Sequence, residues 1–399
     1  FTTGLTRVMV RRRKLFRHAV GLNTHSEEWN DLHQSSQKIP GDNWMAGDFR
    51  GFDKILSILI QNGGKEVILD VAKFCGFMDE ELLALDTLLC DNITAVIDFF
   101  GTLIMLLGGE VSGHQITTFF NSICNVLLHL YAWIVLSKEQ GFDPKEKVDE
   151  FWVKVFICVL GDDIMAKVHP SDTWYNHTTV QRVFGSIGIE YTMADKLSES
   201  IPYIPCGEVG FLKRRFAPHD CFPGMMVAPL EKESIYKMLM YTIPSRDVSS
   251  EEQLSMAICS ALAEAFYHGK EFYNKIEELV SSAPKSEELK ERMKQFPRPS
   301  WSVMYERFLE ASPAYRVSLV DPAFAEAKPE PTDSYCQNTQ TQAQCDWSVD
   351  PWGSTTMGRS PEDSIQSRSR LSFKKFAKHE RGEATSCVEN ERLSKNFKK

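Results

Sequence analysis

Two kinds of apolar pattern alternate along this chain. The first consists of short, nearly continuous apolar runs rich in β-branched and aromatic residues, which favour buried strands. These runs predict strands over residues 44–48, 153–160, 164–168, 189–192 and 211–216.

Longer segments repeat their apolar positions at three- and four-residue spacing, the period of one helical face. They predict helices over residues 52–60, 65–107, 112–137, 171–185 and, between polar loops, 230–309. A further helix near the N-terminus carries the basic residues Arg7, Arg11, Arg12, Arg13, Lys14 and Arg17. This basic surface is either a solvated helical face or a face turned toward phosphates. The mixture predicts an α+β fold.

Composition changes this picture only at the ends of the chain. The sequence lacks a starting Met and the apolar core of a signal peptide, so we expect a piece of a longer protein. The most apolar stretch, 119–136, is interrupted by Asn121, Asn125 and His129, which favours a core helix over a transmembrane one. After about residue 321, Pro, Ser, Thr and Gln dominate, and we expect disorder over 321–399.

Charge and cysteine content exclude little. The net charge of -9 over 399 residues does not suggest a nucleic-acid binder, although a local basic channel can hide inside such a sum. The ten cysteines are scattered and form no CxxC pair, which fits reduced thiols in a cytosolic protein. Cys206, His219 and Cys221 come nearest to a zinc cluster, but a closed site needs four ligands.

The tripeptide Gly161-Asp162-Asp163 joins two predicted buried strands. In a tight turn both carboxylates can reach one exposed point, where they repel each other unless a cation lies between them. Such an oxygen-rich site suits Mg²⁺ or Mn²⁺. Taken alone, the tripeptide is weak evidence for such a site and favours an ordinary solvent-exposed hairpin turn.

A second acidic segment is NWMAGDFRGFDKIL. Asp48 ends a predicted strand and Asp53 follows five residues later, at the start of the next helix. Strand ends are where open α/β sheets place their chemistry. The alternative is that Asp48 caps the following helix.

A third segment, GGEVSGHQITTFFNSICNVL, combines a glycine-rich loop with a polar stripe. Its glycines allow the backbone to approach a ligand closely. Thr117, Asn121 and Asn125 then follow at i, i+4 and i+8 on an otherwise apolar helix. Buried polar side chains need partners, so these groups either read a ribose, satisfy a neighbouring acid or bond within the protein.

Together and in this order, these segments resemble the RNA-dependent RNA polymerases of picornavirus-like positive-strand RNA viruses, with the dicistrovirus and marnavirus-like branches looking closest. The resemblance covers roughly residues 1–315. Five segments are similar to polymerase motifs A to E, namely DFRGFD (48–53), SGHQITTFFNS (112–122), LGDD (160–163), EYTMADK (190–196) and FLKRRF (211–216). Leu160 departs from the aromatic residue of many relatives, but this position carries no ligand.

The resemblance implies a role for each matching residue. Asp48 and Asp162, with Asp163 and the backbone carbonyl of Phe49, would bind two Mg²⁺ (or Mn²⁺) ions that activate the primer 3′-hydroxyl and hold the triphosphate. Lys196, otherwise an ordinary surface lysine, would protonate the departing pyrophosphate. The ribonucleotide would be recognised by Asp53, Ser112, Gly113, Thr117 and Asn121. The primer backbone would be bound by Lys213, Arg214 and Arg215, which without the resemblance would be a basic edge strand.

The implied architecture is a right-hand polymerase: an antiparallel palm sheet backed by helices, a helical thumb, and most of the fingers missing. We expect residues 1–40 to be a fingers remnant, 41–225 the palm, 226–320 the thumb and 321–399 a disordered tail or linker. Because the wall that grips the triphosphate should lie upstream, the isolated chain should polymerise poorly. The implied partners are RNA template and primer, ribonucleoside triphosphates, a small protein primer and other viral replication proteins, at membrane-associated replication complexes in the host cytoplasm.

Two other functions remain open at this stage. One is a non-catalytic RNA-binding or polyprotein segment, against which five intact motifs in an uninterrupted frame argue. The other is a reverse transcriptase, which generally carries an aromatic residue near the position of Asn121 and lacks Gly-Asp-Asp.

Overall fold

The computed structural model describes residues 2–111, 113, 116–283 and 285–320. They cluster into two compact units, of which unit 1 contains residues 2–16 and 51–128 and unit 2 contains residues 17–50 and 129–320. The expected palm range, 41–225, is therefore divided between both units. Ser112 and the expected disordered tail lie outside the described residues.

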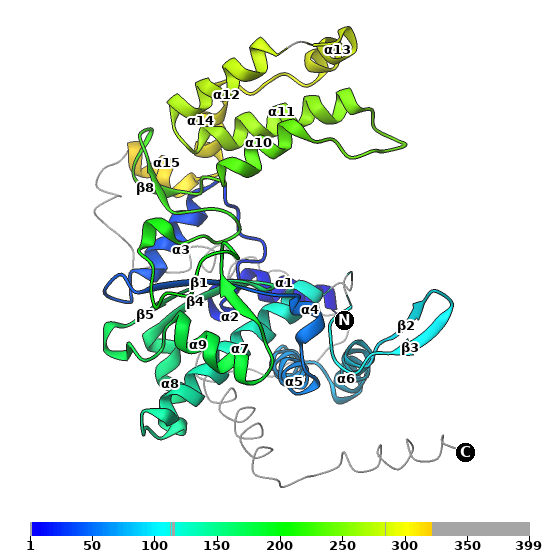
Figure 1. Cartoon of the computed structure of the whole chain (residues 1–399), viewed down its shortest axis with the longest axis vertical. Coiled ribbons are helices and arrows are strands. Elements are labelled where there is room, and N and C mark those ends of the chain that lie inside the picture. Colours follow the sequence, from blue (N-terminus) through cyan, green and yellow to red (C-terminus); the bar gives the residue numbers. More distant parts are fainter. Residues whose placement is uncertain (1, 112, 114–115, 284, 321–399) are drawn as a thin grey trace. The chain divides into compact units, whose positions relative to one another are not determined.

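Unit 2 is built on a four-stranded antiparallel sheet in the order β4-β5-β1-β6 (Figure 1). Its strands are β1 (Trp44–Phe49), β4 (Val155–Leu160), β5 (Asp163–Val168) and β6 (Tyr191–Met193). β4 and β5 are buried along nearly their whole length, which explains why their sequences are continuous apolar runs. The four strands predicted for this sheet are confirmed, with ends displaced by one or two residues.

Helices and a hairpin complete unit 2. In chain order they are α3 (Glu27–Ser36), α8 (Pro144–Lys154), η1 (Pro170–Asp172), α9 (His177–Ser186), η2 (Cys206–Glu208), β7 (Ala217–His219), β8 (Phe222–Val227), α10 (Lys232–Met240), α11 (Ser250–Phe266), α12 (Lys270–Ser282), α13 (Glu287–Gln295), α14 (Trp301–Glu310) and α15 (Pro313–Val320). Many begin with a serine, asparagine or aspartate whose side chain accepts a backbone N–H, as Ser249 does for α11. Helices α10 to α14 lie together in a layered bundle (Figure 1).

Two of the apolar clusters among the described residues of unit 2 bear on the site. One lies on the sheet face formed by Trp44, Ala46, Phe156 and Met165, where Trp29 of α3 also packs. The other joins β8 to the bundle through Phe222, Phe266, Tyr273 and Phe308. The expected boundary between palm and thumb, residue 225, falls inside β8, a strand whose buried side chains belong to this second core.

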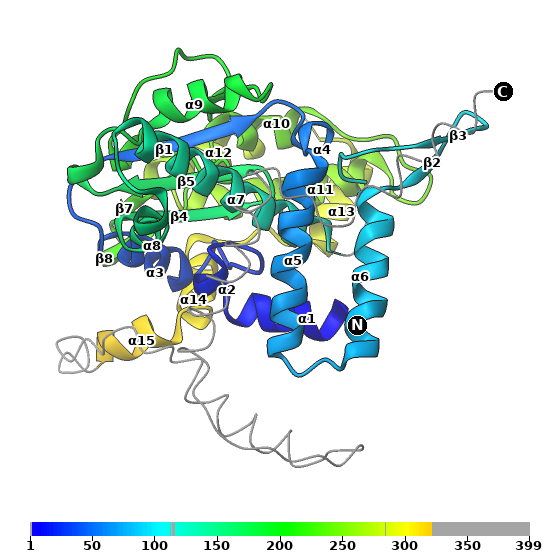
Figure 2. The ribbon, with the colours of Figure 1, turned by 90° about the horizontal axis from the view of Figure 1, so that it is seen from below.

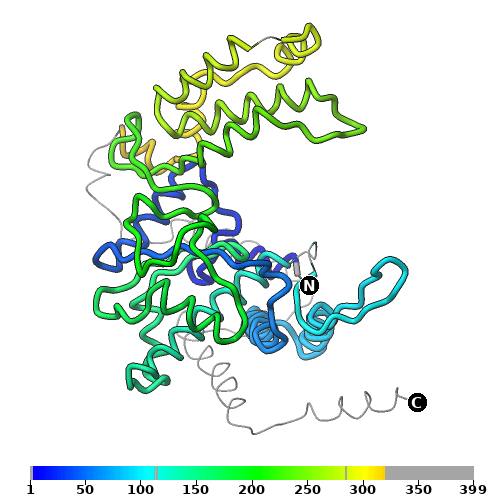
Figure 3. The backbone as a smooth tube through the Cα atoms, in the orientation of Figure 1, coloured from blue at the N-terminus to red at the C-terminus, as the bar shows by residue number. Residues whose placement is uncertain are grey.

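Unit 1 is mainly helical and ends in an exposed hairpin. Its elements are α1 (Thr2–Arg11), α2 (Arg13–Phe16), α4 (Phe52–Ile55), α5 (Ile58–Phe74), α6 (Asp79–Ile93), β2 (Val96–Phe99), β3 (Thr102–Met105) and the first half of α7 (Thr117–Glu139). Figure 2 shows α5 and α6 side by side, and Figure 3 shows the β2–β3 hairpin extending from the end of α6.

Several element predictions are wrong. The helix predicted over 65–107 is divided into α5 and α6 by a break between Phe74 and Asp79, where Gly76 has a φ of 90°. It ends at Ile93, because residues 96–105 pair as a hairpin around the turn at Phe100 and Gly101. The predicted helix over 52–60 is interrupted before α5, and α7 begins five residues later than predicted. Helices α3 and α8 were not predicted. The strand predicted over 211–216 is a turn, described below.

Helix α7 is the one described helix long and apolar enough to cross a membrane by length and composition. In its most apolar window 78% of the residues are buried inside the structure, as in the core helix of a globular protein. The burial therefore agrees with the core-helix interpretation of the sequence.

Candidate functional site: a carboxylate cluster at the end of the sheet

The Gly-Asp-Asp segment forms a two-residue hairpin turn between β4 and β5. Leu160 pairs directly with Asp163, so Gly161 and Asp162 are the turn residues. Gly161 has a φ of 65°, as the first central position of a type II′ turn requires, and a side chain there would be strained. Asp162 is exposed and Asp163 is half-buried at the start of β5. The two acids therefore share the turn but differ in their contact with water.

Asp48 comes to the same end of the sheet through strand register. β1 and β5 pair antiparallel with Gly47 opposite Ile164, so the next position along the ladder places Asp48 beside Asp163. Side chains alternate along a strand, so Asp48 shares a face with Trp44 and Ala46. The alternative that Asp48 caps the next helix is wrong, because Gly51 occupies that N-cap position.

The electrostatics show that the three carboxylates are coupled. Burial raises the pKa of Asp163 to about 7, a backbone hydrogen bond from Leu212 opposes this, and the charges of Asp162 and Asp48 raise it further. Lys196 Nζ lies 2.8 Å from Asp48 Oδ2. This contact and the nearby Asp162 and Asp163 charges raise the pKa of Lys196, against a smaller effect of burial.

The donor set fits a hard divalent cation. All side-chain donors are carboxylate oxygens, which are the ligands Mg²⁺ and Mn²⁺ prefer. Burial is the main cause of the raised pKa of Asp163, and the charges of Asp162 and Asp48 add to it, so a cation at this end of the sheet would stabilise the ionised carboxylates. Within the described part of the chain, no three His, Cys, Asp or Glu side chains are gathered as a metal site.

Backbone atoms of a second tight turn contact the carboxylate cluster. Phe211 and Arg214 exchange both of their backbone hydrogen bonds, at 3.0 and 2.9 Å, across Leu212 and Lys213. The Leu212 N–H donates to Asp163 Oδ2 at 2.7 Å. Leu212 and Lys213 both have a φ of 57°, which is unfavourable for residues other than glycine. The predicted strand is therefore a strained turn that presents an N–H to Asp163.

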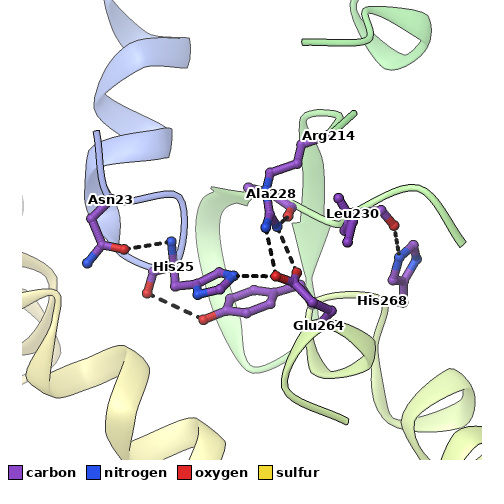
Figure 4. Close-up of polar contacts among 8 residues, drawn as sticks. Asn23, His25, Arg214, Ala228, Leu230, Glu264 and His268 are labelled. Atoms are coloured by element: carbon purple, nitrogen blue, oxygen red, sulfur yellow. Dashed lines mark hydrogen bonds and ion pairs between the residues drawn. The ribbon is translucent and has the colours of Figure 1, made fainter. Parts of the chain in front are cut away.

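The three basic side chains of this turn differ in exposure. Lys213 and Arg215 are exposed. Arg214 is not, since its guanidinium donates to Glu264 at 2.7 and 2.8 Å and to the Ala228 carbonyl at 2.8 Å (Figure 4). The geometry therefore argues against the predicted phosphate contact for Arg214 and leaves Lys213 and Arg215 for that role.

Unit 1 contains the polar residues predicted to recognise the nucleotide. Asn121 Nδ2 donates to Asp53 Oδ1 at 2.9 Å, so the stripe on α7 satisfies a neighbouring acid. The Asn121 Oδ1 atom is buried and has no hydrogen-bond partner among the described residues. Thr117 Oγ1 donates to the Val111 carbonyl at 3.3 Å, and Gly113 is exposed with a φ of 99°. Asn125, the last residue of the stripe, is fully buried.

Glu110 is a member of this network that the sequence did not reveal. Its side chain accepts from Asn92 Nδ2 at 2.9 Å. Burial raises its pKa to about 7, hydrogen bonds from Asn92 and Thr117 oppose this, and the Asp53 charge raises it again. Its position inside the glycine-rich loop, directly after Gly108 and Gly109, was the available signal in the sequence.

Gly47 and Tyr191 were also missed. Tyr191 is fully buried against Phe49, and a Cβ on Gly47 would overlap the tyrosine hydroxyl. The close approach fixes β6 against β1 immediately beside Asp48. A glycine inside a strand pattern often marks such an approach, so this signal was present in the sequence.

The chain matches the family model described as viral RNA-dependent RNA polymerase over residues 5–283. It is 31% identical over 269 residues to the RNA1 polyprotein of satsuma dwarf virus, covering 66% of this chain and 12% of that one. It is 28% identical over 266 residues to the replicase polyprotein of cricket paralysis virus, covering 65% of this chain and 15% of that one. The chain thus spans less than a fifth of these relatives.

A solved structure, a sicinivirus 3Dpol RNA-dependent RNA polymerase, has a similar fold with a TM-score of 0.60 and 20% identity. The similarity covers 77% of this chain and 59% of that one. The family match over most of the described residues confirms the resemblance found in the sequence. The chain belongs to the picornavirus-like viral RNA-dependent RNA polymerases, a family of nucleotidyltransferases.

Proposed function

We propose that this chain carries out template-directed RNA synthesis, transferring nucleotides from ribonucleoside triphosphates to an RNA 3′-hydroxyl during viral genome replication. The observation that carries this proposal is the convergence of Asp48, Asp162 and Asp163 at one end of an antiparallel sheet in a chain of this family. Within this proposal residues 41–225 act as the palm, 226–320 as the thumb and 1–40 as a fingers remnant.

The three carboxylates and the Phe49 carbonyl would hold two Mg²⁺ or Mn²⁺ ions. When bound, such ions supply an activated 3′-hydroxyl and neutralise charge on the triphosphate. The chain's own contribution is a rigid frame, since the turn and the β1–β5 register fix where the carboxylates lie. Asp162 is exposed to solvent at the tip of the turn, whereas Asp163 is held by the Leu212 N–H.

Lys196 would donate its Nζ proton to the pyrophosphate as the bond to the α-phosphate breaks. The raised pKa supports this role, because the ammonium group stays protonated at neutral pH. Its ion pair with Asp48 keeps the side chain beside the carboxylates although 66% of it is exposed.

Asp53, Ser112, Gly113, Thr117 and Asn121 would distinguish ribose from deoxyribose. The Asp53–Asn121 hydrogen bond supports this, because it fixes the amide while Asn121 Oδ1 keeps an open acceptor position for a hydroxyl donor. Lys213 and Arg215 would contact primer phosphates. A protein primer, other replication proteins and membrane-associated complexes in the host cytoplasm complete the proposed setting.

Primer extension on an RNA template with Mg²⁺ tests the proposal. The chain alone and the chain within its parent polyprotein are compared, each with Asp162→Asn and with Asp247→Asn, which removes an exposed loop carboxylate. We expect ribonucleotide incorporation in the polyprotein context that Asp162→Asn abolishes and Asp247→Asn preserves. Incorporation that survives Asp162→Asn would place the active site elsewhere, and a preference for deoxyribonucleotides would indicate a reverse transcriptase.

A further inference from the structure

The Leu212–Lys213 turn is an unusual support for a ligand carboxylate. The Leu212 N–H donates directly to Asp163. Yet Leu212 and Lys213 both adopt a positive φ, a backbone conformation that costs free energy in residues other than glycine. A strained turn persists only where its surroundings hold it in place. The contacts that hold this one identify residues that act on the carboxylate cluster from a distance.

The turn is tied to the segment 228–231 by backbone atoms. Arg214 pairs with Leu230, Arg215 N donates to Pro229 O at 3.3 Å, and Glu231 N donates to Lys213 O at 2.8 Å. This segment is in turn held by the connection between α11 and α12, because His268 Nε2 lies 2.6 Å from Leu230 O (Figure 4).

The strongest side-chain tie is the ion pair between Arg214 and Glu264 of α11. Both side chains are only 11% exposed, and both carboxylate oxygens of Glu264 accept from the guanidinium. Arg214 uses a further N–H on Ala228 O, so its charged head bridges α11 and the segment beneath the turn. A bidentate, nearly buried pair of this kind fixes orientation as well as distance.

His25 extends the same cluster to the N-terminal part of unit 2. Its Nε2 lies 3.0 Å from Glu264 Oε1, and its ring stacks on Tyr267 at 4.9 Å between centroids. The His25 N–H donates to Asn23 Oδ1 at 3.0 Å, which fixes the loop before α3 (Figure 4). Glu264 is thus held from both sides.

We propose that Glu264 is a positioning residue for the metal-binding carboxylates, acting through Arg214 and the strained turn to aim the Leu212 N–H at Asp163. This inference rests on the proposed function, since it assigns Glu264 a role in the same carboxylate site. The connection runs from Glu264 to Arg214 by side chain, from Arg214 to Leu212 through the turn, and from Leu212 to Asp163 by backbone hydrogen bond. Glu264 itself touches neither substrate nor metal.

The test measures Mn²⁺ affinity of the metal-free full chain by electron paramagnetic resonance, together with backbone hydrogen exchange over 211–214. Glu264→Gln keeps the shape of the side chain but removes its charge. We expect Mn²⁺ to bind about tenfold more weakly, as for other residues that orient metal ligands. The Leu212 amide should exchange at least about threefold faster, since a buried hydrogen bond is loosened.

Two further variants separate positioning from stability. Asp172→Asn weakens another ion pair, in which the Asp172 side chain is 3% exposed and that of Lys154 27%, beyond the opposite end of β5 from Asp163. It should destabilise unit 2 without changing Mn²⁺ affinity. The double variant Arg214→Met with Glu264→Met replaces the pair by apolar side chains, which preserves folding but removes the directed bonds. It should bind Mn²⁺ as weakly as Glu264→Gln.

Each other outcome overturns a defined claim. Parent-like Mn²⁺ affinity and Leu212 exchange in Glu264→Gln would overturn the positioning role while leaving the carboxylate site intact. Equal weakening by Asp172→Asn would also overturn it, because the effect would then follow stability. If the single variant Asp162→Asn binds Mn²⁺ as tightly as the unsubstituted chain, the proposed metal site itself is wrong.

Discussion

Glu110 in unit 1 and Glu264 in unit 2 are both buried carboxyl groups, with 6% and 8% exposure. The contribution of burial, taken by itself, is to raise the pKa of both carboxyl groups. Glu110 meets only neutral donors and the repelling charge of Asp53, and its pKa rises to about 7. Glu264 accepts hydrogen bonds from His25 and Arg214 and lies beside the Arg214 charge, and its pKa falls to about 2 despite burial.

The difference shows that partners, more than burial, decide the charge of an enclosed carboxyl group. Amide and hydroxyl partners satisfy hydrogen bonds but leave the desolvation of a charge uncompensated. The hydrogen bonds and positive charge of Arg214, together with His25, outweigh it at Glu264. We therefore interpret Glu264 as an anchor that is charged at neutral pH and Glu110 as a group that changes charge near neutral pH.

Removing the cation of the Glu264 pair should have the largest effect. Arg214→Met leaves a carboxylate enclosed without its main counter-charge, and we expect a loss of about 3 kcal/mol in the free energy of unfolding. Urea unfolding of the full chain measures this loss. Adding Glu264→Met should restore most of the stability, whereas a double variant as unstable as the single one would show that the cost is lost packing.

Acid should remove the contribution of the ionised Glu264 carboxylate to the free energy of unfolding. Because the folded pKa of about 2 lies below the unfolded value, this contribution is present above about pH 4.5 and is lost as the pH falls through the folded pKa. Between pH 5 and pH 3 the stability advantage of the parent over Glu264→Gln should shrink by about 2 kcal/mol. An advantage that stays constant over this range would mean that Glu264 is not ionised in the folded chain.

For Glu110 the dependence is opposite, since raising the pH should lower the free energy of unfolding. Its folded pKa of about 7 lies above the unfolded value, so its contribution is fully present at low pH and is lost as the pH rises through 7. From pH 5.5 to pH 7, Glu110→Gln should gain about 1.5 kcal/mol relative to the parent. Asp91→Asn, at an exposed position on α6, serves as the control and should show no such gain.

The partners of a segment also decide whether its structure could be predicted from sequence. The β4–β5 hairpin and β1 were predictable because local pattern and burial agree, since apolar runs, a Gly-Asp turn and a strand-end acid all indicate one structure. Asp48, Asp162 and Asp163 are therefore placed by local rules, and their convergence follows from register.

The turn at 211–214 and the hairpin at 96–105 could not be predicted in this way. Leu212 and Lys213 adopt positive φ because distant groups, Glu264 and the segment 228–231, hold the turn, and no local propensity records such contacts. Residues 96–105 are almost entirely exposed, so their apolar spacing does not report a buried face. Periodicity predicts structure only where the apolar residues are buried.

The smallest expected effect comes from His25, the second group that contacts Glu264. Its side chain is 40% exposed, compared with 11% for Arg214, so water can replace much of its interaction. His25→Ala should lower the free energy of unfolding by about 1 kcal/mol through the lost hydrogen bond and the lost stacking on Tyr267. The loss of stability between pH 5 and pH 3 should persist in this variant, because Arg214 still keeps Glu264 ionised. If His25→Ala instead abolishes that acid dependence, the histidine and not the arginine keeps Glu264 ionised, and the contrast with Glu110 would rest on the more exposed of its two partners.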